Sequence, residues 1–399
     1  MENETEYWLW LVMTFGAANN RIWEVVAEFE DNPLAAYNAL KDGRVKGLTE
    51  RERSAAATTH LSQARALVQY CAENGYGICT YSDDEYPLSL KPIYNPPAVL
   101  FYRGDISSLN SDLALTVVGT RKPSQYSIEV TTRICRELAK IGFTIVSGFA
   151  VGIDIAAQAA ALHEGGKSFG VLGCGIDYDY PKENYAMREQ IIANGALITE
   201  FLLGERPAGS NFPKRNRVLS ALSMGTLVIE AGFGSGALIT AECAIEQGRD
   251  LFCIPPASIF DARYAGVIKY LRDGAIPVFG HGDILYEYYT TYSHKLSAAE
   301  PYALKSEALT FAEKPAPVRE KAKSAPKAEE EKHVEVDYSL LDGNQTAIVK
   351  LLESGAKHFD EITSELELNI SELFAIITEL EFMEIIEAQA GKFYKIKTS

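Results

Sequence analysis

Between residues 113 and 279 the hydrophobic residues come in short, uninterrupted runs that alternate with longer amphipathic segments. The runs are typical of buried strands and cover 113–118, 144–146, 169–172, 196–198, 226–229 and 251–254. Helical spacing occurs between them, at 128–141, 155–163, 185–193, 218–224 and 237–247. Apolar strands separated by helices predict an α/β fold, a parallel sheet covered by helices on both faces. Such sheets bind ligands at the carboxyl ends of their strands.

The pattern before this region is different. Residues 1–80 show helical spacing, with one apolar stripe from Trp8 to Phe15, and predict a small N-terminal helical domain. Residues 81–103 contain four prolines and little periodicity, so we expect a connecting segment that packs along the next domain. The central domain is therefore placed at residues 81–296.

The pattern after the central domain also changes. Residues 297–336 are rich in Lys, Glu, Ala and Pro, which predicts a flexible linker. Residues 337–399 regain globular patterning, with three short helical segments followed by a two-stranded hairpin, the outline of a winged-helix domain.

Charge argues against DNA binding by this last domain. Residues 338–397 carry 11 acidic residues, 5 lysines and no arginine. The segment expected to act as recognition helix, 371–381, bears Glu372, Glu379 and Glu381 and no cation, and phosphates would repel it. A protein-interaction or regulatory module is predicted, and a remnant domain without a partner is the alternative.

Composition limits the class of protein. The formal net charge of −16 argues against a protein that coats DNA nonspecifically, although it leaves room for a local basic groove. No apolar run approaches the ~20 residues of a membrane span, and the start of the chain does not resemble a secretory signal. The six cysteines form no Cys-x-x-Cys pair and are expected to be buried, reduced thiols. The predicted location is cytoplasmic, without membrane contact.

Positive charge concentrates just before one of the expected strands. Lys214, Arg215 and Arg217 fall within four residues, with Asn216 between them and Phe212 beside them. An acidic chain that gathers cations next to an aromatic ring and glycine-rich turns is expected to bind a polyanion there.

Turns with small residues follow the expected strands. They are Gly119-Thr120-Arg121, the segment from Ser147-Gly148 to Asp154, Gly173-Cys174-Gly175 with Tyr180-Pro181-Lys182, and Glu230 with Gly232 to Gly236, which includes Ser235. Each turn alone is a weak signal, but together they place glycines and cations on one rim of one sheet. Glycines let backbone N–H groups approach an anion, and helix N-termini favour negative charge.

The sequence argues against several kinds of catalytic or nucleotide-binding site. Gly166-Lys167-Ser168 resembles the end of a P-loop, but the motif needs a glycine where Ala161 stands. No turn has a full Gly-x-Gly-x-x-Gly with an acidic ribose partner, and the six histidines are scattered. We therefore predict no catalytic residue, no metal site and no cofactor. Asp154 is read as a first-turn carboxylate, whereas Glu230 could be catalytic or could orient the neighbouring turns.

The ordered set of turns resembles the DprA (Smf) family of bacterial DNA-processing proteins. The most specific pieces are Gly119-Thr120-Arg121, Ser147 to Asp154, Tyr180-Pro181-Lys182, Phe212-Pro213 with Arg215-Asn216-Arg217, and Glu230-Ala231 with Ser235-Gly236. The resemblance covers residues 81–278 and extends to the flanking domains by position. It implies an extended Rossmann domain, a SAM-like N-terminal domain and a C-terminal winged helix.

The resemblance also implies a function and its residues. The family binds single-stranded DNA without hydrolysing it, protects incoming strands during natural transformation and helps load RecA in recombination. Arg121, Lys182 and the segment Lys214 to Arg217 would meet phosphates, and Phe212 would offer a face near the bases. The backbone of Gly119, Thr120, Ser147, Gly148, Ser235 and Gly236 would line the pocket.

A homodimer is expected from the same resemblance. The family's self-association and RecA-contact surface implies an interface formed by Ile268, Tyr270, Leu271 and Val278. Two residues depart from the family pattern: Gln158 replaces the usual histidine, and Ile268 replaces the usual asparagine.

A nucleotide-processing enzyme on a related Rossmann scaffold, such as a phosphoribohydrolase, is the competing hypothesis. Those enzymes carry a Pro-Gly-Gly turn where this chain reads Glu230-Ala231-Gly232. Clustered cations also suit a long phosphate backbone better than one nucleotide, because phosphate contacts add up along a strand.

Overall fold

The computed structural model describes residues 4–292 except 112, residue 338, and residues 341–397 except 367–369, 384 and 390–392. The chain divides into two compact units, Met1–Glu313 and Lys314–Ser399, which are described separately. The predicted linker, 297–336, lies outside the described residues. In the described part of the chain, no helix combines the length and the apolar character needed to cross a membrane.

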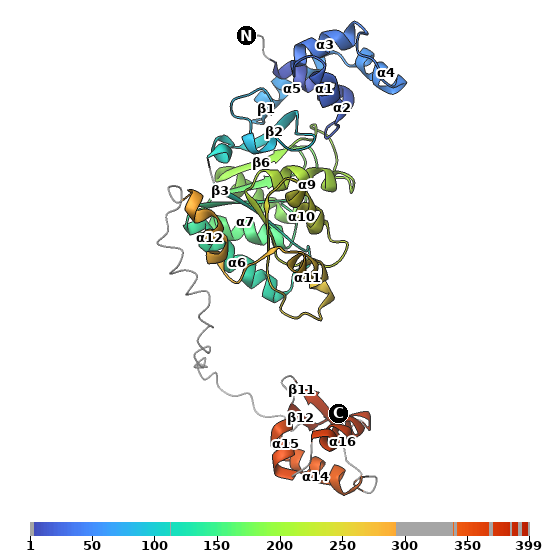
Figure 1. Ribbon diagram of the computed structural model, residues 1–399, viewed down its shortest axis with the longest axis vertical. Helices are drawn as coiled ribbons and strands as arrows, with labels where there is room; N and C mark the ends of the chain where they lie inside the picture. Colours follow the sequence, from blue (N-terminus) through green and yellow to red (C-terminus); the bar gives the residue numbers. More distant parts are fainter. Residues whose placement is uncertain are drawn as a thin grey trace. The chain divides into compact units, whose positions relative to one another are not determined.

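The first unit begins with the predicted helical domain (Figure 1). Its helices are α1 (Thr5–Phe15), α2 (Arg21–Ala27), α3 (Pro33–Lys41), α4 (Glu50–Thr58) and α5 (Leu61–Glu73). These helices do not form an independent core. The core of α1 and α2 continues into Val99 and Phe101 of the central sheet, and the indole of Trp23 donates a 2.7 Å hydrogen bond to the Pro96 carbonyl oxygen.

Within residues 4–292, nine strands form one sheet in the order β1-β2-β6-β5-β4-β3-β7-β8-β9. They are β1 (Gly77–Thr80), β2 (Val99–Gly104), β3 (Leu113–Val118), β4 (Phe143–Ser147), β5 (Ser168–Val171), β6 (Gly195–Thr199), β7 (Gly225–Val228), β8 (Asp250–Cys253) and β9 (Ile276–Pro277). The six predicted strands β3 to β8 are confirmed and pair in parallel. The sequence pattern missed β1 and β2, which extend the sheet in antiparallel fashion.

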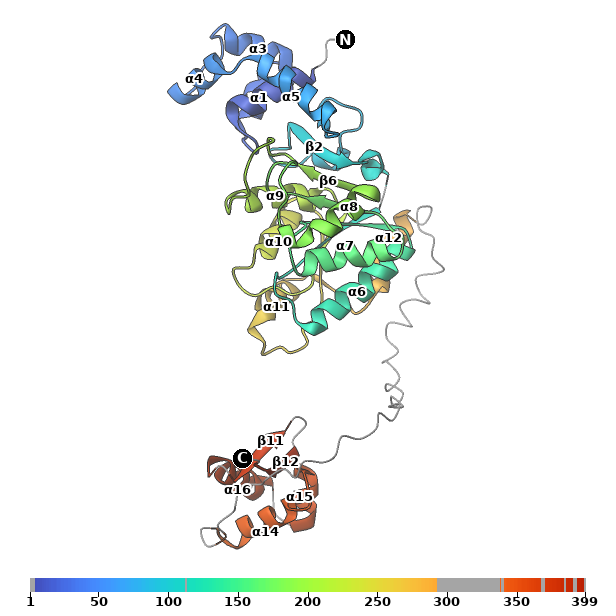
Figure 2. The same ribbon diagram turned by 180° about the vertical axis from the view of Figure 1, so that it is seen from behind.

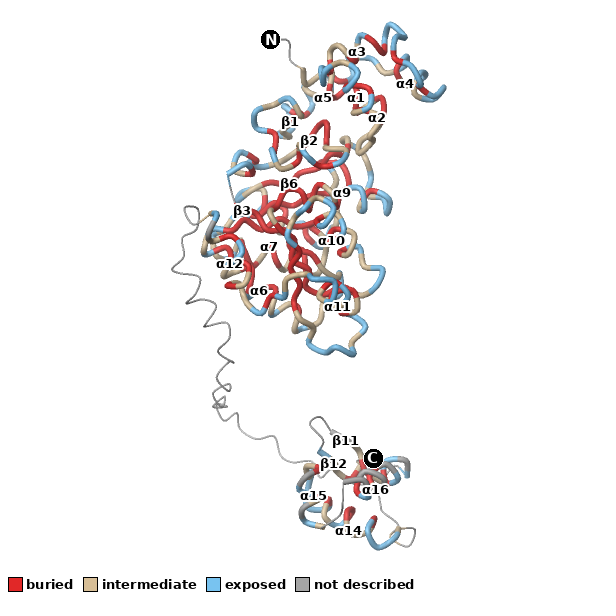
Figure 3. The backbone as a smooth tube through the Cα atoms, viewed as in Figure 1, coloured by how far each residue is buried: buried red, intermediate tan, exposed pale blue. Residues whose placement is uncertain are grey.

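Helices cover both faces of this sheet, as predicted (Figures 1 and 2). One face packs against α6 (Gln125–Lys140), α7 (Ile153–His163) and α12 (His281–Tyr292), and α8 (Tyr185–Ala193) lies beside α7. The other face packs against α9 (Asn211–Ala221), α10 (Gly236–Glu246) and α11 (Ala265–Arg272). Short 3₁₀ turns are η1 (Leu88–Leu90), η2 (Ser107–Asn110), η3 (Lys182–Asn184) and η4 (Ala262–Tyr264). Figure 3 shows that burial is concentrated along the central strands.

Five of the six cysteines are buried and all are free thiols, while Cys243 is partly exposed. Burial raises the pKa of the Cys135 and Cys253 thiols to about 12, which keeps them protonated. The prediction of reduced structural thiols is confirmed for these residues.

The second unit is a winged helix. Its helices are α14 (Gly343–Leu352), α15 (Phe359–Leu366) and α16 (Ile370–Phe382). In its described residues, three strands form a sheet in the order β10 (Lys357–His358), β12 (Phe393–Ile396) and β11 (Ile386–Gln389). The predicted hairpin is the β11–β12 pair, and β10 is an addition that the pattern did not indicate. The helices share a core that includes Ile348, Leu373 and Ile377.

Candidate nucleic-acid interface

A cavity of about 260 Å³ lies at the carboxyl ends of β3 and β7. The order of strands reverses here, since β4, β5 and β6 follow on one side of β3 and β7, β8 and β9 on the other. A crevice opens at such a reversal because the loops after the two strands turn to opposite faces of the sheet. The cavity is lined by Val118, Gly119, Thr120, Arg121, Ala150, Asp154, Phe212, Arg215, Asn216, Leu219, Ser235, Gly236, Ala237 and Thr240. Several residues of the predicted rim therefore border one cavity.

One face of α9 forms a wall of this cavity. Phe212, Arg215, Asn216 and Leu219 stand at positions i, i+3, i+4 and i+7, which share one side of a helix. The sequence pattern began a helix only at residue 218, whereas α9 starts at Asn211 and includes the whole cationic segment. The helical geometry then determines the direction in which each cationic side chain points.

The three cations do not gather on one surface, and this part of the sequence prediction is wrong. Residues two apart on a helix lie about 200° apart around its axis, so Arg217 turns away from Arg215. Arg217 forms a 2.5 Å ion pair with Glu200, a buried carboxylate whose pKa is raised chiefly by burial. Lys214 is exposed and borders neither this cavity nor the smaller one beside it.

Arg215 is an internal residue of the cavity floor and is only 6% exposed. Its guanidinium donates to the carbonyl oxygens of Gly148, at 2.9 Å, and Val171, and to the Asn216 side-chain oxygen at 3.1 Å. Burial lowers its pKa to about 10, so it remains charged at neutral pH. Arg215 ties α9 to the ends of β4 and β5, and a phosphate could use only the little of it that stays exposed.

Asp154 lies near this guanidinium and is also 6% exposed. Its carboxylate accepts a 3.4 Å hydrogen bond from the backbone N–H of Ala150, in the turn that precedes α7. Burial raises the pKa of Asp154 to about 6, although Arg215 and the backbone donors act in the opposite direction. A Cβ at Gly148 would lie 2.6 Å from the Asp154 carboxylate and 2.8 Å from Arg215, so a larger residue there would have to displace one of these side chains.

The Phe212 ring borders the cavity and also the smaller cavity beside it. The Arg121 guanidinium carbon lies 5.3 Å from its ring centroid, and the Tyr180 ring lies 5.9 Å away. Behind the ring is a second, smaller cavity of about 30 Å³, whose lining includes Gly148, Gly173, Tyr180 and Pro181. Arginine over an aromatic ring is a favourable cation–π arrangement that leaves the remaining guanidinium donors available.

The N-terminus of α10 closes the other side of the cavity. Ser235 caps the helix by accepting from the Ala237 N–H, and the Asn216 side-chain amide donates to the Gly236 carbonyl oxygen at 3.1 Å. The positive end of the helix dipole therefore borders the cavity, where it favours an anion.

Two predicted binding residues stand outside the cavities. The Ser147 hydroxyl is fully buried and donates a 2.6 Å hydrogen bond to the Val117 carbonyl oxygen, so it joins β4 to β3 instead of lining a pocket. Lys182 is exposed on η3, next to Pro181 of the smaller cavity.

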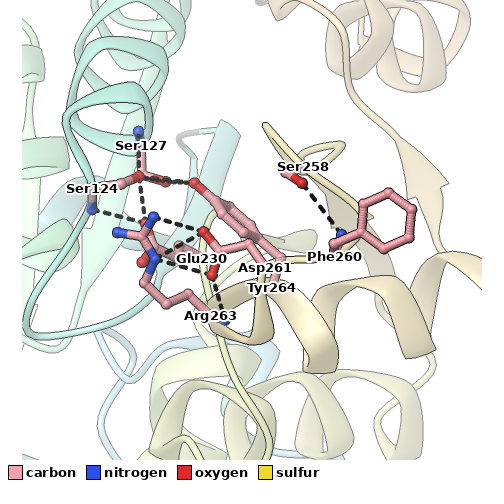
Figure 4. A network of polar contacts seen from close by, with 8 residues as sticks. All are labelled: Ser124, Ser127, Glu230, Ser258, Phe260, Asp261, Arg263 and Tyr264. Carbon is pink, nitrogen blue, oxygen red and sulfur yellow. Dashed lines mark hydrogen bonds and ion pairs between the residues drawn. The ribbon is translucent and has the colours of Figure 1, made fainter. Parts of the chain in front are cut away.

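Glu230 orients the neighbouring turns, the second of the two roles left open by the sequence (Figure 4). Its buried carboxylate accepts from the Ser124 N–H at 2.9 Å and from the Ser124 hydroxyl at 2.7 Å, and its own carbonyl oxygen accepts from the Thr120 N–H. Tyr264 completes the network through the hydroxyls of Ser124 and Ser127. Tyr264 could not be identified from the sequence, because its partners lie more than a hundred residues away.

The predicted dimer residues are only partly on the surface. Tyr270 and Val278 are buried in the domain core, so little of either side chain reaches the surface. Ile268 and Leu271 on α11 are partly exposed.

Comparison with known proteins places this geometry in a family. Residues 77–289 match the family described as DNA recombination-mediator protein A, and residues 323–392 match the DprA winged helix domain. The DNA processing protein DprA of Bacillus subtilis is 38% identical over 223 residues, 56% of this chain and 74% of that protein. Protein Smf of Synechocystis is 33% identical over 290 residues, 71% of this chain and 72% of that protein.

Two solved structures agree with the sequence matches. The X-ray structure of DprA from Streptococcus pneumoniae superposes with a TM-score of 0.63 at 30% identity, over 72% of this chain and 99% of that one. DprA from Helicobacter pylori, studied for its single-stranded DNA binding mode, gives 0.50 at 30% identity, over 54% and 97%. This chain, with its largely parallel sheet and its winged helix, thus belongs to the DprA family.

Proposed function

We propose that this chain binds single-stranded DNA in the cavity at the ends of β3 and β7, without catalysis, and hands the strand to a recombinase. The observation that carries the proposal is the juxtaposition of Arg121, the Phe212 ring and the N-terminus of α10 around one cavity of about 260 Å³. A strand offers a phosphate to the helix N-terminus and a base to the aromatic ring.

The geometry favours a strand over a duplex. Phe212 lines the cavity, where a flexible strand can turn its base toward the ring. Bases in a duplex are stacked on each other and cannot reach a side chain set into a cavity. The study of the Helicobacter pylori relative, which concerns single-stranded DNA, supports the same ligand here.

A non-catalytic role is part of the proposal. The competing hypothesis needs a carboxylate at the reacting centre, and Glu230 was the candidate. Its carboxylate is buried and accepts two hydrogen bonds from Ser124, and Glu230 does not border the cavity. A nucleotide in the cavity would therefore meet no general base from this position.

The test is a titration of labelled single strands and duplexes across salt concentrations. We expect tighter binding of single strands without sequence preference. The logarithm of the binding constant should fall linearly with the logarithm of the salt concentration. Its slope should be about −0.7 for each phosphate neutralised. Equal affinity for duplex would contradict the proposal, as would steady nucleotide turnover that Glu230→Gln abolishes.

The cellular role follows the family resemblance. The chain would protect single strands and help load RecA on them in natural transformation or another recombination process, in the cytoplasm, where such strands and RecA meet. Faster RecA filament growth on protected strands in the presence of the chain would support this role, and an unchanged rate would argue against it.

A homodimer through α11 is the remaining part of the proposal. Ile268 and Leu271 supply the partly exposed apolar surface, which suits a self-complementary two-fold contact. Light scattering should give a dimer for the wild type and a monomer for Ile268→Glu. A monomeric wild type at tens of micromolar, or a dimeric variant, would refute the contact.

A further inference from the structure

Two neighbouring loops beside the cavity carry exposed apolar side chains. Phe233, in the loop after β7, is 74% exposed, and Phe260, in the loop after β8, is 92% exposed with Ile259 beside it at 70%. We call Phe233, Ile259 and Phe260 the apolar ledge. Single exposed apolar residues are ordinary on protein surfaces, but two phenylalanines on adjoining loops next to a binding cavity are not explained by packing.

The two loops touch each other and the cavity wall. A Cβ at Gly232 would lie 3.1 Å from the Ala262 carbonyl oxygen, and the Gly266 N–H donates to the Ala231 carbonyl oxygen at 2.9 Å. Phe233 precedes by two and three residues Ser235 and Gly236, which line the cavity. The surface is therefore continuous from the cavity, over the β7 loop, to the loop that carries Phe260.

Hydrogen bonds and an ion pair hold the loop that carries Phe260, as Figure 4 shows. The Ser258 hydroxyl accepts from the Phe260 N–H at 3.3 Å, and Asp261 caps η4 and pairs with Arg263 at 2.6 Å. The network of Tyr264, Ser124 and Glu230 then ties this loop to the turn after β3. The ring of Phe260 points away from this network. An aromatic side chain presented from a rigid loop loses little conformational entropy on binding.

Charge next to the ledge suits a phosphate backbone. The turn after β3 exposes Arg121 and Lys122, and Ser124 in the same segment is hydrogen-bonded to Tyr264. Arg263 contributes less, because Asp261 neutralises it. Exposed aromatic rings next to exposed cations are the combination that binds single strands without sequence preference.

We infer that the apolar ledge is a second base-stacking site, which receives the nucleotides of a single strand as they leave the cavity. The inference rests on the proposed function, since the strand must first occupy the cavity. Phe233 and Phe260 stack bases, while Arg121 and Lys122 neutralise the phosphates between the cavity and the ledge. The site binds any base, because every base has a π face.

The test compares two lengths of labelled oligothymidylate by fluorescence anisotropy: one of about 2 nucleotides, which the cavity of about 260 Å³ and its rim can hold, and one of about 20, which also reaches the ledge. Loss of one stacked base weakens binding by about 5- to 150-fold, so Phe233→Ala and Phe260→Ala should each weaken the long strand at least 5-fold. Both should bind the short strand within two-fold of wild type. Tyr94→Ala, which removes a ring that is 79% exposed elsewhere, is the matched control and should change neither affinity.

The outcomes separate the ledge from the cavity. If the wild type binds neither length, the proposed function itself fails. If the wild type binds both lengths and Phe260→Ala binds the long strand as tightly, the ledge is refuted and the cavity stands. A change of molar mass in Phe260→Ala with unchanged DNA affinity would also refute it, because the ledge would then be a protein contact. A Phe260→Trp variant gives a direct readout: its added fluorescence should be quenched by the long strand and not by the short one.

Discussion

Gly152 packs against the backbone of the turn that carries Arg121, so a substitution at Gly152 should affect both stability and DNA binding. Its φ of +92° and ψ of −128° lie in a region that only glycine occupies readily, at the start of α7. A Cβ there would lie 2.4 Å from the Thr120 carbonyl oxygen and 2.8 Å from the Arg121 Cα. Both atoms belong to the backbone, so a flexible side chain cannot relieve the contact. Gly152→Ala must therefore push the turn that carries Arg121 outward by about 1 Å.

The expected loss in the free energy of unfolding of Gly152→Ala has two parts. The unfavourable dihedral angles cost about 1–3 kcal/mol, and the forced contact adds about 1–3 kcal/mol. Gly165→Ala is the matched control, because Gly165 also has a positive φ, +74°, but a Cβ there would meet nothing within 4 Å. This control should lose only about 1–2 kcal/mol.

Thermal unfolding and strand binding measure the two consequences. A domain of this size loses about 2–4 °C in Tm for each kcal/mol, so the melting temperatures of the variants should be clearly separated. Displacing Arg121 should also weaken single-strand binding about tenfold or more, the range of one charged hydrogen bond, while Gly165→Ala binds like wild type. Equal losses of Tm in both variants, or undiminished binding by Gly152→Ala, would refute the steric reasoning.

Three further changes follow from the same geometry. Arg121→Ala should weaken single-strand binding more than Lys182→Ala, because of these two residues only Arg121 borders the cavity. Both variants should keep the wild-type Tm within about 2 °C. A titration in which Lys182→Ala weakens binding more would contradict binding at this cavity. Because burial raises the pKa of Asp154 to about 6, lowering the pH from about 7 to 5 protonates it, removes a negative charge beneath the cavity and should tighten binding. Asp154→Asn should flatten that pH profile, and an unchanged profile would exclude Asp154 as its source. Truncation after residue 296 should leave single-strand affinity within a few-fold, and a tenfold loss would show that the winged helix takes part.

The sequence predicted the sheet and the rim because both depend on local patterns. Continuous apolar runs can form only buried strands or buried helices, and their short lengths favoured strands. Strand ends in a parallel sheet necessarily share an edge, so Gly119, Phe212 and Gly236 could be brought together without knowing any contact.

The positions and partners of the cationic side chains could not be predicted in the same way. Lys214, Arg215 and Arg217 look equivalent in the sequence, and only the start of α9 at Asn211 decides that Arg215 points to the floor. Its burial also depends on carbonyl oxygens of Gly148 and Val171, which lie 67 and 44 residues away. The role of the Ser147 hydroxyl could not be predicted for the same reason, since its partner is the carbonyl oxygen of Val117 on the neighbouring strand.

The internal positions of Arg215 and Arg217 change how an acidic chain can hold DNA. With these two cations engaged inside the protein, binding at the cavity relies on Arg121, the dipole of α10 and the Phe212 ring. Helix dipoles and stacked rings release few counterions, whereas surface lysines and arginines release about 0.7 for each phosphate of a single strand that they neutralise. The salt dependence of binding should consequently be shallow for the length of strand covered. Such a site holds a strand mainly by the shape and stacking of its bases, which is also why Phe233 and Phe260, two uncharged residues, can extend it.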